Sequence, residues 1–172
     1  MKKYFLETER LYLRKMTKDD YADVAEMLQD EKVMYAWEYT FEKKDIDEWI
    51  NKNIQRYAQY NMGYFLLEDK STGNIVGQAA ITPDTINGES HLEIGYILKY
   101  KFQGMGYATE AAKGLVEYAS KYLGVSHVIF EIRPENVASI KVAERLGAKQ
   151  NGSFVKSVRG KNMKHFIYTL VL

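Results

Sequence analysis

The sequence predicts one α/β (α+β) domain over residues 1–172, built on a mixed, mostly antiparallel and twisted sheet of about seven strands flanked by about four helices. The length of 172 residues suits a single domain. Apolar residues recur with helical spacing in the first third of the chain and then alternate, which indicates helices followed by strands. A helical connection between two later strands predicts that these two pair in parallel, with a right-handed crossover.

The first third of the chain predicts one strand and two helices. Residues 11–14 form a short strand candidate. Thr17 and Asp20 have the spacing of a capping box, which predicts a helix that continues to about Leu28. A second helical pattern runs through about 42–60.

The middle of the chain predicts three strands, at 64–68, 75–81 and about 91–98, and residues 71–74 have the composition of a hairpin turn. A helix follows at about 107–123 and a strand at 128–132. The remaining elements are a helix over 136–146, with Gly147 as its left-handed C-terminal residue, and two strands near 148–155 and 165–172.

Composition excludes several classes of protein. The chain has no cysteine, so disulfides, thiolate metal sites and cysteine nucleophiles are excluded, and three scattered histidines argue against a histidine-built metal site. We therefore expect no metal. A net charge of +1 argues against a general nucleic-acid binder. The sequence has no signal peptide and no long apolar run, so we expect a cytoplasmic protein that does not bind membranes.

Two glycines, Gly104 and Gly106, precede the helix predicted at 107–123. Glycine lets the backbone approach a ligand closely, and the unpaired amides at a helix start favour phosphate oxygens. The segment therefore predicts a ligand with a phosphate or pyrophosphate group, although a tight turn before a packed helix is the plainer interpretation. A dinucleotide-binding fingerprint is disfavoured because Thr109 replaces its third small residue, even though an acid, Glu131, ends the next strand.

Two segments resemble signatures of the GCN5-related N-acetyltransferase (GNAT) family. Residues 103–111 (QGMGYATEA) resemble its pyrophosphate loop, and residues 133–147 (RPENVASIKVAERLG) resemble its second signature. Further matches at 7–14, 73–77 and 93–96 resemble the branch of ribosomal-protein N-terminal acetyltransferases. The resemblance covers nearly the whole chain and implies the α/β fold of that family.

The resemblance implies acetyl-CoA as co-substrate and a set of contacts to it. The phosphates would lie on main-chain amides of the glycine loop, and the pantetheine arm would pair with the preceding strand. Asn136 would hydrogen-bond the cofactor while also capping its helix, and Lys141 is either a phosphate contact or a solvated lysine. The residues implied are Tyr96, Ile97, Leu98, Gln103, Gly104, Met105, Gly106, Tyr107, Ala108, Thr109, Asn136 and Lys141.

The implied reaction is acetyl transfer to a primary amine by direct attack in a ternary complex. Glu93 matches the acidic position that serves as general base, through a water, in many relatives; the alternative is an exposed strand glutamate. A backbone N–H near Ile97 or Leu98 would stabilise the oxyanion. The family's tyrosine acid is replaced by Ala143, so Ser139 is our candidate for that role, with an ordinary helix serine as the alternative.

The acceptor is less defined by the sequence. Trp37 and Glu38 lie in an aromatic segment where relatives bind the acceptor, and would hold a cationic amine; the alternative is aromatic packing between helices. A protein N-terminus, a polyamine or a small-molecule amine all fit as acceptor, and the protein would be a monomer or homodimer. The missing tyrosine also leaves a non-catalytic acyl-CoA sensor or structural module as the alternative function.

Overall fold

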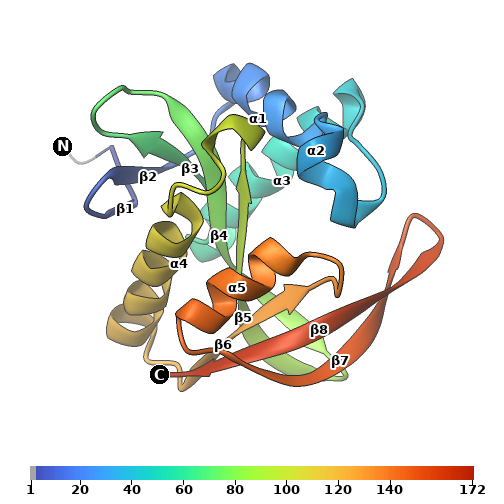
Figure 1. Ribbon diagram of the computed structural model, residues 1–172. Coiled ribbons are helices and arrows are strands. Elements are labelled where there is room, and N and C mark those ends of the chain that lie inside the picture. Colours follow the sequence, from blue (N-terminus) through green and yellow to red (C-terminus); the bar gives the residue numbers. More distant parts are fainter. Residues whose placement is uncertain (1–2) are drawn as a thin grey trace.

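A single sheet forms the centre of the computed structural model, which describes residues 3–172. Its strands are β1 (Leu6–Glu7), β2 (Leu11–Lys15), β3 (Gly63–Asp69), β4 (Ile75–Ile86), β5 (Glu89–Leu98), β6 (His127–Ile132), β7 (Lys149–Val158) and β8 (Lys161–Val171). They lie in the order β1-β2-β3-β4-β5-β6-β8-β7 (Figure 1). The predicted mixed sheet is confirmed, with the two-residue β1 as an additional edge strand.

Helices cover both faces of this sheet. They are α1 (Tyr21–Leu28), α2 (Glu31–Met34), α3 (Lys43–Tyr60), α4 (Tyr107–Tyr118) and α5 (Val137–Arg145). In Figure 1, α4 and α5 lie in front of the sheet and α3 lies behind it. The one-turn α2 is the helix that the sequence pattern does not predict. No helix of residues 3–172 is both long and apolar enough to cross a membrane.

Local capping signals place the helix ends where the sequence predicts them. The Thr17–Asp20 capping box is formed on both sides. Asn136 caps α5 by accepting a hydrogen bond from the Ser139 N–H, and Gly147 has a left-handed φ of 96° after the helix. The predicted helix at 107–123 is α4 followed by a wider π-helical turn, Ala119–Leu123.

The pairing of neighbouring strands changes from antiparallel to parallel between β5 and β6. This pair is parallel, as the helical crossover predicts, whereas every other pair of neighbouring strands is antiparallel. Over the described residues the parallel register is limited to Glu93 opposite Ile129. Residues 94–98 of β5 therefore have a free main-chain edge on the β6 side, where α5 lies over the gap.

β4 continues five residues beyond the strand predicted at 75–81, through Pro83 to Ile86. Proline normally interrupts a central strand because it has no N–H to donate. Here β3 pairs with β4 only as far as Ile81, so no neighbour needs a hydrogen bond from Pro83 on that side. The chain then turns at Asn87 and Gly88, both at positive φ, into β5.

The β7–β8 hairpin is also longer than predicted. Its strands pair up to Val158 and Lys161, with Arg159 and Gly160 at positive φ in a two-residue turn. The hairpin extends away from the sheet toward the loop before α3 (Figure 1). It therefore reaches toward the face of the sheet that α3 covers, where Arg159 pairs with Asp45.

Candidate active site

The start of α4 presents its backbone amides without a side-chain cap. Gly106 is the N-terminal flanking residue of this helix, and no side chain there accepts from the first amides. Gly104 and Gly106 have left-handed φ values of 78° and 82°, and a Cβ on Gly104 would meet no atom within 4 Å. This combination of unpaired amides, helix dipole and open backbone fits a phosphate or diphosphate.

Side chains from the other end of the sheet hold this loop in place. Arg10 donates a hydrogen bond to the Met105 carbonyl at 3.0 Å, and its guanidinium lies 4.3 Å from the ring centre of Tyr107. The Tyr107 hydroxyl donates to Asp69 at 2.7 Å. The hydrogen bonds that Asp69 accepts from Ser71 and Tyr107 lower the pKa of its carboxyl. Sequence patterns do not reveal these supports, because Arg10 and Asp69 are far from α4 along the chain.

The free edge of β5 presents alternate amides toward the gap beside β6. The Lys99 N–H donates to the Val76 carbonyl on the β4 side, and Ile97 lies opposite Gln78 in the same register. Hydrogen-bonded pairs alternate along an antiparallel ladder, so the Ile97 N–H faces β4 and the Leu98 N–H faces the gap. Of the two backbone donors suggested by the sequence, Leu98 therefore has the orientation to reach a ligand there.

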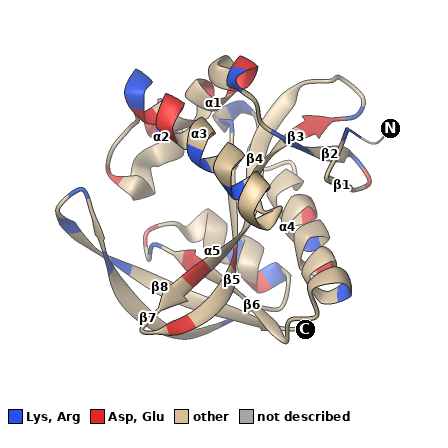
Figure 2. Ribbon diagram, turned by 180° about the vertical axis from the view of Figure 1, so that it is seen from behind, with Lys and Arg blue, Asp and Glu red and all other residues tan. Residues whose placement is uncertain are grey.

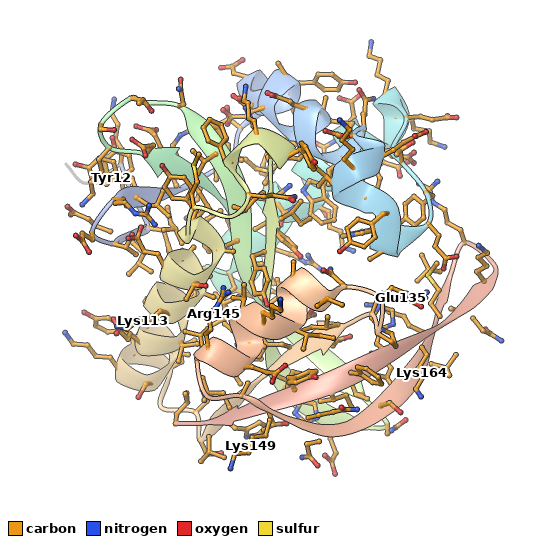
Figure 3. All side chains as sticks on the ribbon, viewed as in Figure 1. Tyr12, Lys113, Glu135, Arg145, Lys149 and Lys164 are labelled. Atoms are coloured by element: carbon orange, nitrogen blue, oxygen red, sulfur yellow. The ribbon has the colours of Figure 1, made fainter. Side chains whose placement is uncertain are left out.

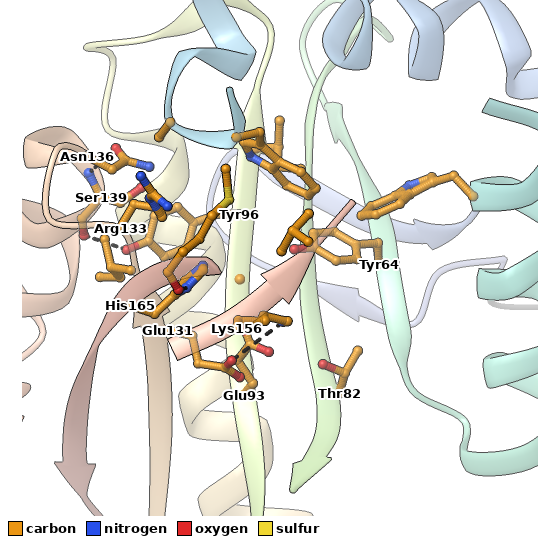
Figure 4. Close-up of a pocket in the computed structure, with 18 of the residues that line it drawn as sticks. Tyr64, Thr82, Glu93, Tyr96, Glu131, Arg133, Asn136, Ser139, Lys156 and His165 are labelled. Carbon is orange, nitrogen blue, oxygen red and sulfur yellow. Dashed lines mark hydrogen bonds and ion pairs between the residues drawn. The ribbon is translucent and has the colours of Figure 1, made fainter. Parts of the chain in front are cut away.

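A cavity of about 470 Å³ lies beside this part of β5 (Figure 4). Its floor includes Glu93, Gly95 and Ile97 of β5, and Tyr64 of β3 lies in its wall. A Cβ on Gly95 would lie 2.7 Å from the Tyr64 hydroxyl, so glycine is needed at this position for the tyrosine to lie across the strand. The volume is in the range of pockets for small molecules, roughly 300–1,000 Å³.

Two carboxyl groups that line the cavity, Glu93 and Glu131, meet a third, Asp84, beside it. Oxygens of Asp84, Glu93 and Glu131 lie within 4.8 Å of one another. Lys156 of β7 lies 3.7 Å from a Glu131 oxygen, an ion pair drawn in Figure 4. A divalent cation could bridge carboxylates at this spacing, and the Lys156 ammonium brings one positive charge to the same place.

Burial and mutual repulsion favour the protonated form of Glu131. The Glu131 side chain is 2% exposed, and neither of its oxygens accepts a hydrogen bond from a described residue. Burial, with Asp84 and Glu93 nearby, raises the pKa of Glu131 far above its usual range. A protonated Glu131 can donate to a neighbouring carboxylate. Burial also raises the pKa of Glu93, and a proton donated by Glu131 would oppose this shift.

The residues predicted on α5 lie beside the β5 edge. The Tyr96 hydroxyl donates to the Ser139 carbonyl at 2.6 Å (Figure 4). The Asn136 amide oxygen accepts from the Ser139 N–H and from the Tyr35 hydroxyl, each at 3.2 Å. The Asn136 NH₂ is therefore the part of this side chain that remains for a ligand. Lys141 is exposed on α5, where its role stays a prediction.

The two predicted acceptor residues are not brought together. Trp37 lines the cavity and packs edge-on against Trp49. Glu38 instead points its carboxylate at two cations, Arg133 at 2.9 Å and Lys161 at 3.2 Å. It closes the loop onto the hairpin, so a role in binding an amine would require these ion pairs to open.

Comparisons with known proteins agree with this geometry. Residues 10–149 match a family model described as an acetyltransferase (GNAT) domain. The uncharacterised protein YkkB of Bacillus subtilis is 33% identical over 95% of this chain and 93% of its own length. YnaD, an uncharacterised N-acetyltransferase of the same species, is 31% identical over 89% of this chain and 87% of its own length.

Solved structures show the same fold over nearly the whole chain. A GNAT-family acetyltransferase from Bacillus anthracis superposes with a TM-score of 0.80 at 27% identity, covering 96% of this chain and 97% of that chain. RimL, a ribosomal L7/L12 alpha-N-protein acetyltransferase solved in complex with coenzyme A, has a TM-score of 0.77 at 18% identity, with 96% of each chain covered.

Proposed function

Because the chain belongs to the GNAT acetyltransferase family, we propose that it transfers the acetyl group of acetyl-CoA to a primary amine by direct attack in a ternary complex. The observation that carries this proposal is that three features lie close together around β5. The uncapped start of α4 follows β5 along the chain, and β5 has a free main-chain edge beside β6. The Glu93 carboxyl lies at the floor of the cavity beside the same strand.

The residues of the cofactor side fit acetyl-CoA, which supplies a thioester carbonyl open to attack by a neutral amine. The amides at 107–109 would hold its phosphates, with Gly104 and Gly106 keeping that surface free of side chains. The free edge of β5 would pair with its extended amide-containing arm, and the Asn136 NH₂ would donate to it. Leu98 would direct its N–H at the reacting carbonyl oxygen.

Glu93 is the base in this proposal. An alkylamine has a pKa near that of lysine, about 10.4, so it reaches the cavity protonated and must lose a proton before it attacks. Glu93 accepts that proton, directly or through a water. Glu131 keeps its own proton and donates a hydrogen bond to Glu93, which stabilises the ionised base.

Ser139 is the candidate donor to the departing sulfur. A thiol with a pKa of about 8.5 leaves as a thiolate with little acid assistance, so a hydrogen bond from a hydroxyl suffices. Ser139 lies at the start of α5, whose dipole also favours negative charge. The buried Ala143 leaves no ionisable group at the position of the family's tyrosine.

Two measurements test this function. Calorimetry should detect acetyl-CoA binding, and an assay of free thiol should detect coenzyme A release that depends on an added amine. Binding without amine-dependent thiol release across a broad amine panel would contradict catalysis and support a sensor role instead.

A further inference from the structure

Two cations that lack carboxylate partners lie on one wall of the cavity. Lys52 and Arg56 are one turn apart on the same face of α3, and Lys156 of β7 lies across from them. Among residues 3–172, no carboxylate lies within ion-pair distance of Lys52 or Arg56. In Figure 2, blue segments on α3 and on the β7–β8 hairpin flank the space in front of β5.

These three cations repel one another. Partial burial, together with Arg56 and Lys156, lowers the pKa of Lys52. Like charges one turn apart also destabilise a helix. The other cations of the cavity wall are compensated, because Arg133 pairs with Glu38 and Arg159 pairs with Asp45 at 3.1 Å. The uncompensated positive charge is therefore confined to the α3 side of the cavity.

The mouth of the cavity limits the size of what enters. At the tip of the hairpin, the Arg159 guanidinium stacks 3.8 Å from the Tyr39 ring centre and also pairs with Asp45 of α3. Lys161 adds its ion pair with Glu38. Lys164, labelled in Figure 3, lies farther along β8 and has no ion pair among the described residues. The hairpin thus closes over a cavity of small-molecule size.

Resting on the proposed acetyltransferase function, we propose that the acceptor is a small amine that also carries an anionic group, a carboxylate or a phosphate, bound by Lys52 and Arg56. Its amine would lie at Glu93 and its chain along the aromatic wall of Trp37 and Trp49. Charges of opposite sign on the β5 floor and on the α3 wall of one cavity orient a zwitterion, because the reverse orientation places like charges together. An uncharged peptide N-terminus or a polyamine would leave the cations without a partner.

The test compares acceptors that share an amine and differ in the remote group. In the carboxylate arm, amino acids are compared with their carboxamides and with diamines of equal length. In the phosphate arm, aminoalkyl phosphates are compared with the corresponding amino alcohols. A neutral peptide serves as the macromolecular acceptor. We expect kcat/KM to be at least about tenfold higher for the carboxylate or phosphate member, since hydrogen bonds to charged groups differ from neutral ones by about this factor. The carboxylate and phosphate arms identify which anion is preferred.

The Lys52→Gln, Arg56→Gln double variant links any preference to these residues. It should lose most of the advantage of the anionic acceptor over its neutral analogue. Lys149→Gln, at an exposed position on β7 outside the cavity, is the matched control and should keep the advantage. Raising the salt concentration should weaken the preference of the unmodified protein.

Several results would overturn the inference. One is that carboxamides, diamines or the neutral peptide are turned over as well as the anionic acceptors or better. A second is that the preference for the anionic acceptor survives in the double variant. A third is that a protein that binds acetyl-CoA turns over no anionic amine. Calorimetry separates this failure from that of the proposed function, because a protein that does not bind acetyl-CoA at all overturns both.

Discussion

The Tyr96 hydroxyl donates a 2.6 Å hydrogen bond to the Ser139 carbonyl, and thereby joins β5 to α5 across the gap in the sheet. On one side of this link is the free edge of β5 and on the other is the cavity that contains Glu93. The link fixes the distance between β5 and α5. In the proposed reaction, β5 would contact the carbonyl oxygen of the thioester and α5 would contact its sulfur. Burial raises the pKa of the Tyr96 hydroxyl, so this hydroxyl keeps its proton and remains a hydrogen-bond donor.

Removing this hydrogen bond should cost stability. We expect Tyr96→Phe to lower the free energy of unfolding by about 1–2 kcal/mol, because the hydrogen bond to the Ser139 carbonyl is lost in a half-buried place. Urea denaturation measures the change. Tyr122→Phe, at a ring that is 62% exposed, should have no measurable effect. Equal stability of the two variants would contradict the role of Tyr96 as a link.

Glu93→Gln should lower turnover by about 10²–10⁴ at neutral pH with acetyl-CoA binding retained, because the amide cannot accept a proton. Steady-state kinetics with a reactive amine gives the ratio. The matched control is Glu89→Gln, on the same strand but with a side chain that is 81% exposed. A loss of less than about threefold, with the chemical step rate-limiting, would remove Glu93 from the mechanism.

The pH dependence of turnover should show how Glu131 acts on Glu93. Glu93 works only when ionised, and burial raises its pKa, so activity should rise with pH through that raised pKa. Glu131→Leu removes the hydrogen-bond donor and should move this limb of the profile to higher pH. Glu131→Gln keeps an NH₂ donor and should leave the limb close to its original position. A shift to lower pH in the leucine variant would mean that Glu131 is ionised and repels Glu93.

Stability in acid should depend on Asp69. Its pKa is lowered in the folded protein by Ser71 and Tyr107, so its contribution is present above the unfolded value of 3.8 and is lost as the pH falls below that value. The difference in unfolding free energy between the unmodified protein and Asp69→Asn should therefore be largest near pH 7 and shrink toward pH 3. A difference that stays constant with pH would show that ionisation of Asp69 is unimportant.

Local chemistry explains which parts of this site the sequence predicts. The glycine loop at 104–106, the Asn136 cap and the position of Glu93 on a strand depend on neighbouring residues, so their patterns are visible in one chain. The partnership of Glu93 with Glu131 depends on the single parallel register between β5 and β6, which no local pattern encodes. The same holds for Glu38, whose ion pair with Lys161 joins residues 123 positions apart.

The cationic wall is a second feature that depends on long-range structure. Lys52 and Arg56 appear in the sequence as ordinary polar positions of an amphipathic helix. They become notable only because the β7–β8 hairpin extends to Arg159 and Gly160 and brings Lys156 opposite them. The extended hairpin in turn depends on a two-residue turn at positive φ, which the sequence marks only by one glycine.

The binding of acetyl-CoA to Gly106→Glu tests the central claim most directly. The new carboxylate would stand at the helix start where phosphates are expected, so calorimetry should find no binding while circular dichroism finds a folded protein. Gly88→Glu is the matched control, because Gly88 has nearly the same φ, 81° against 82°, in a turn away from α4. We predict that Gly88→Glu binds normally; unchanged affinity in Gly106→Glu would contradict the account.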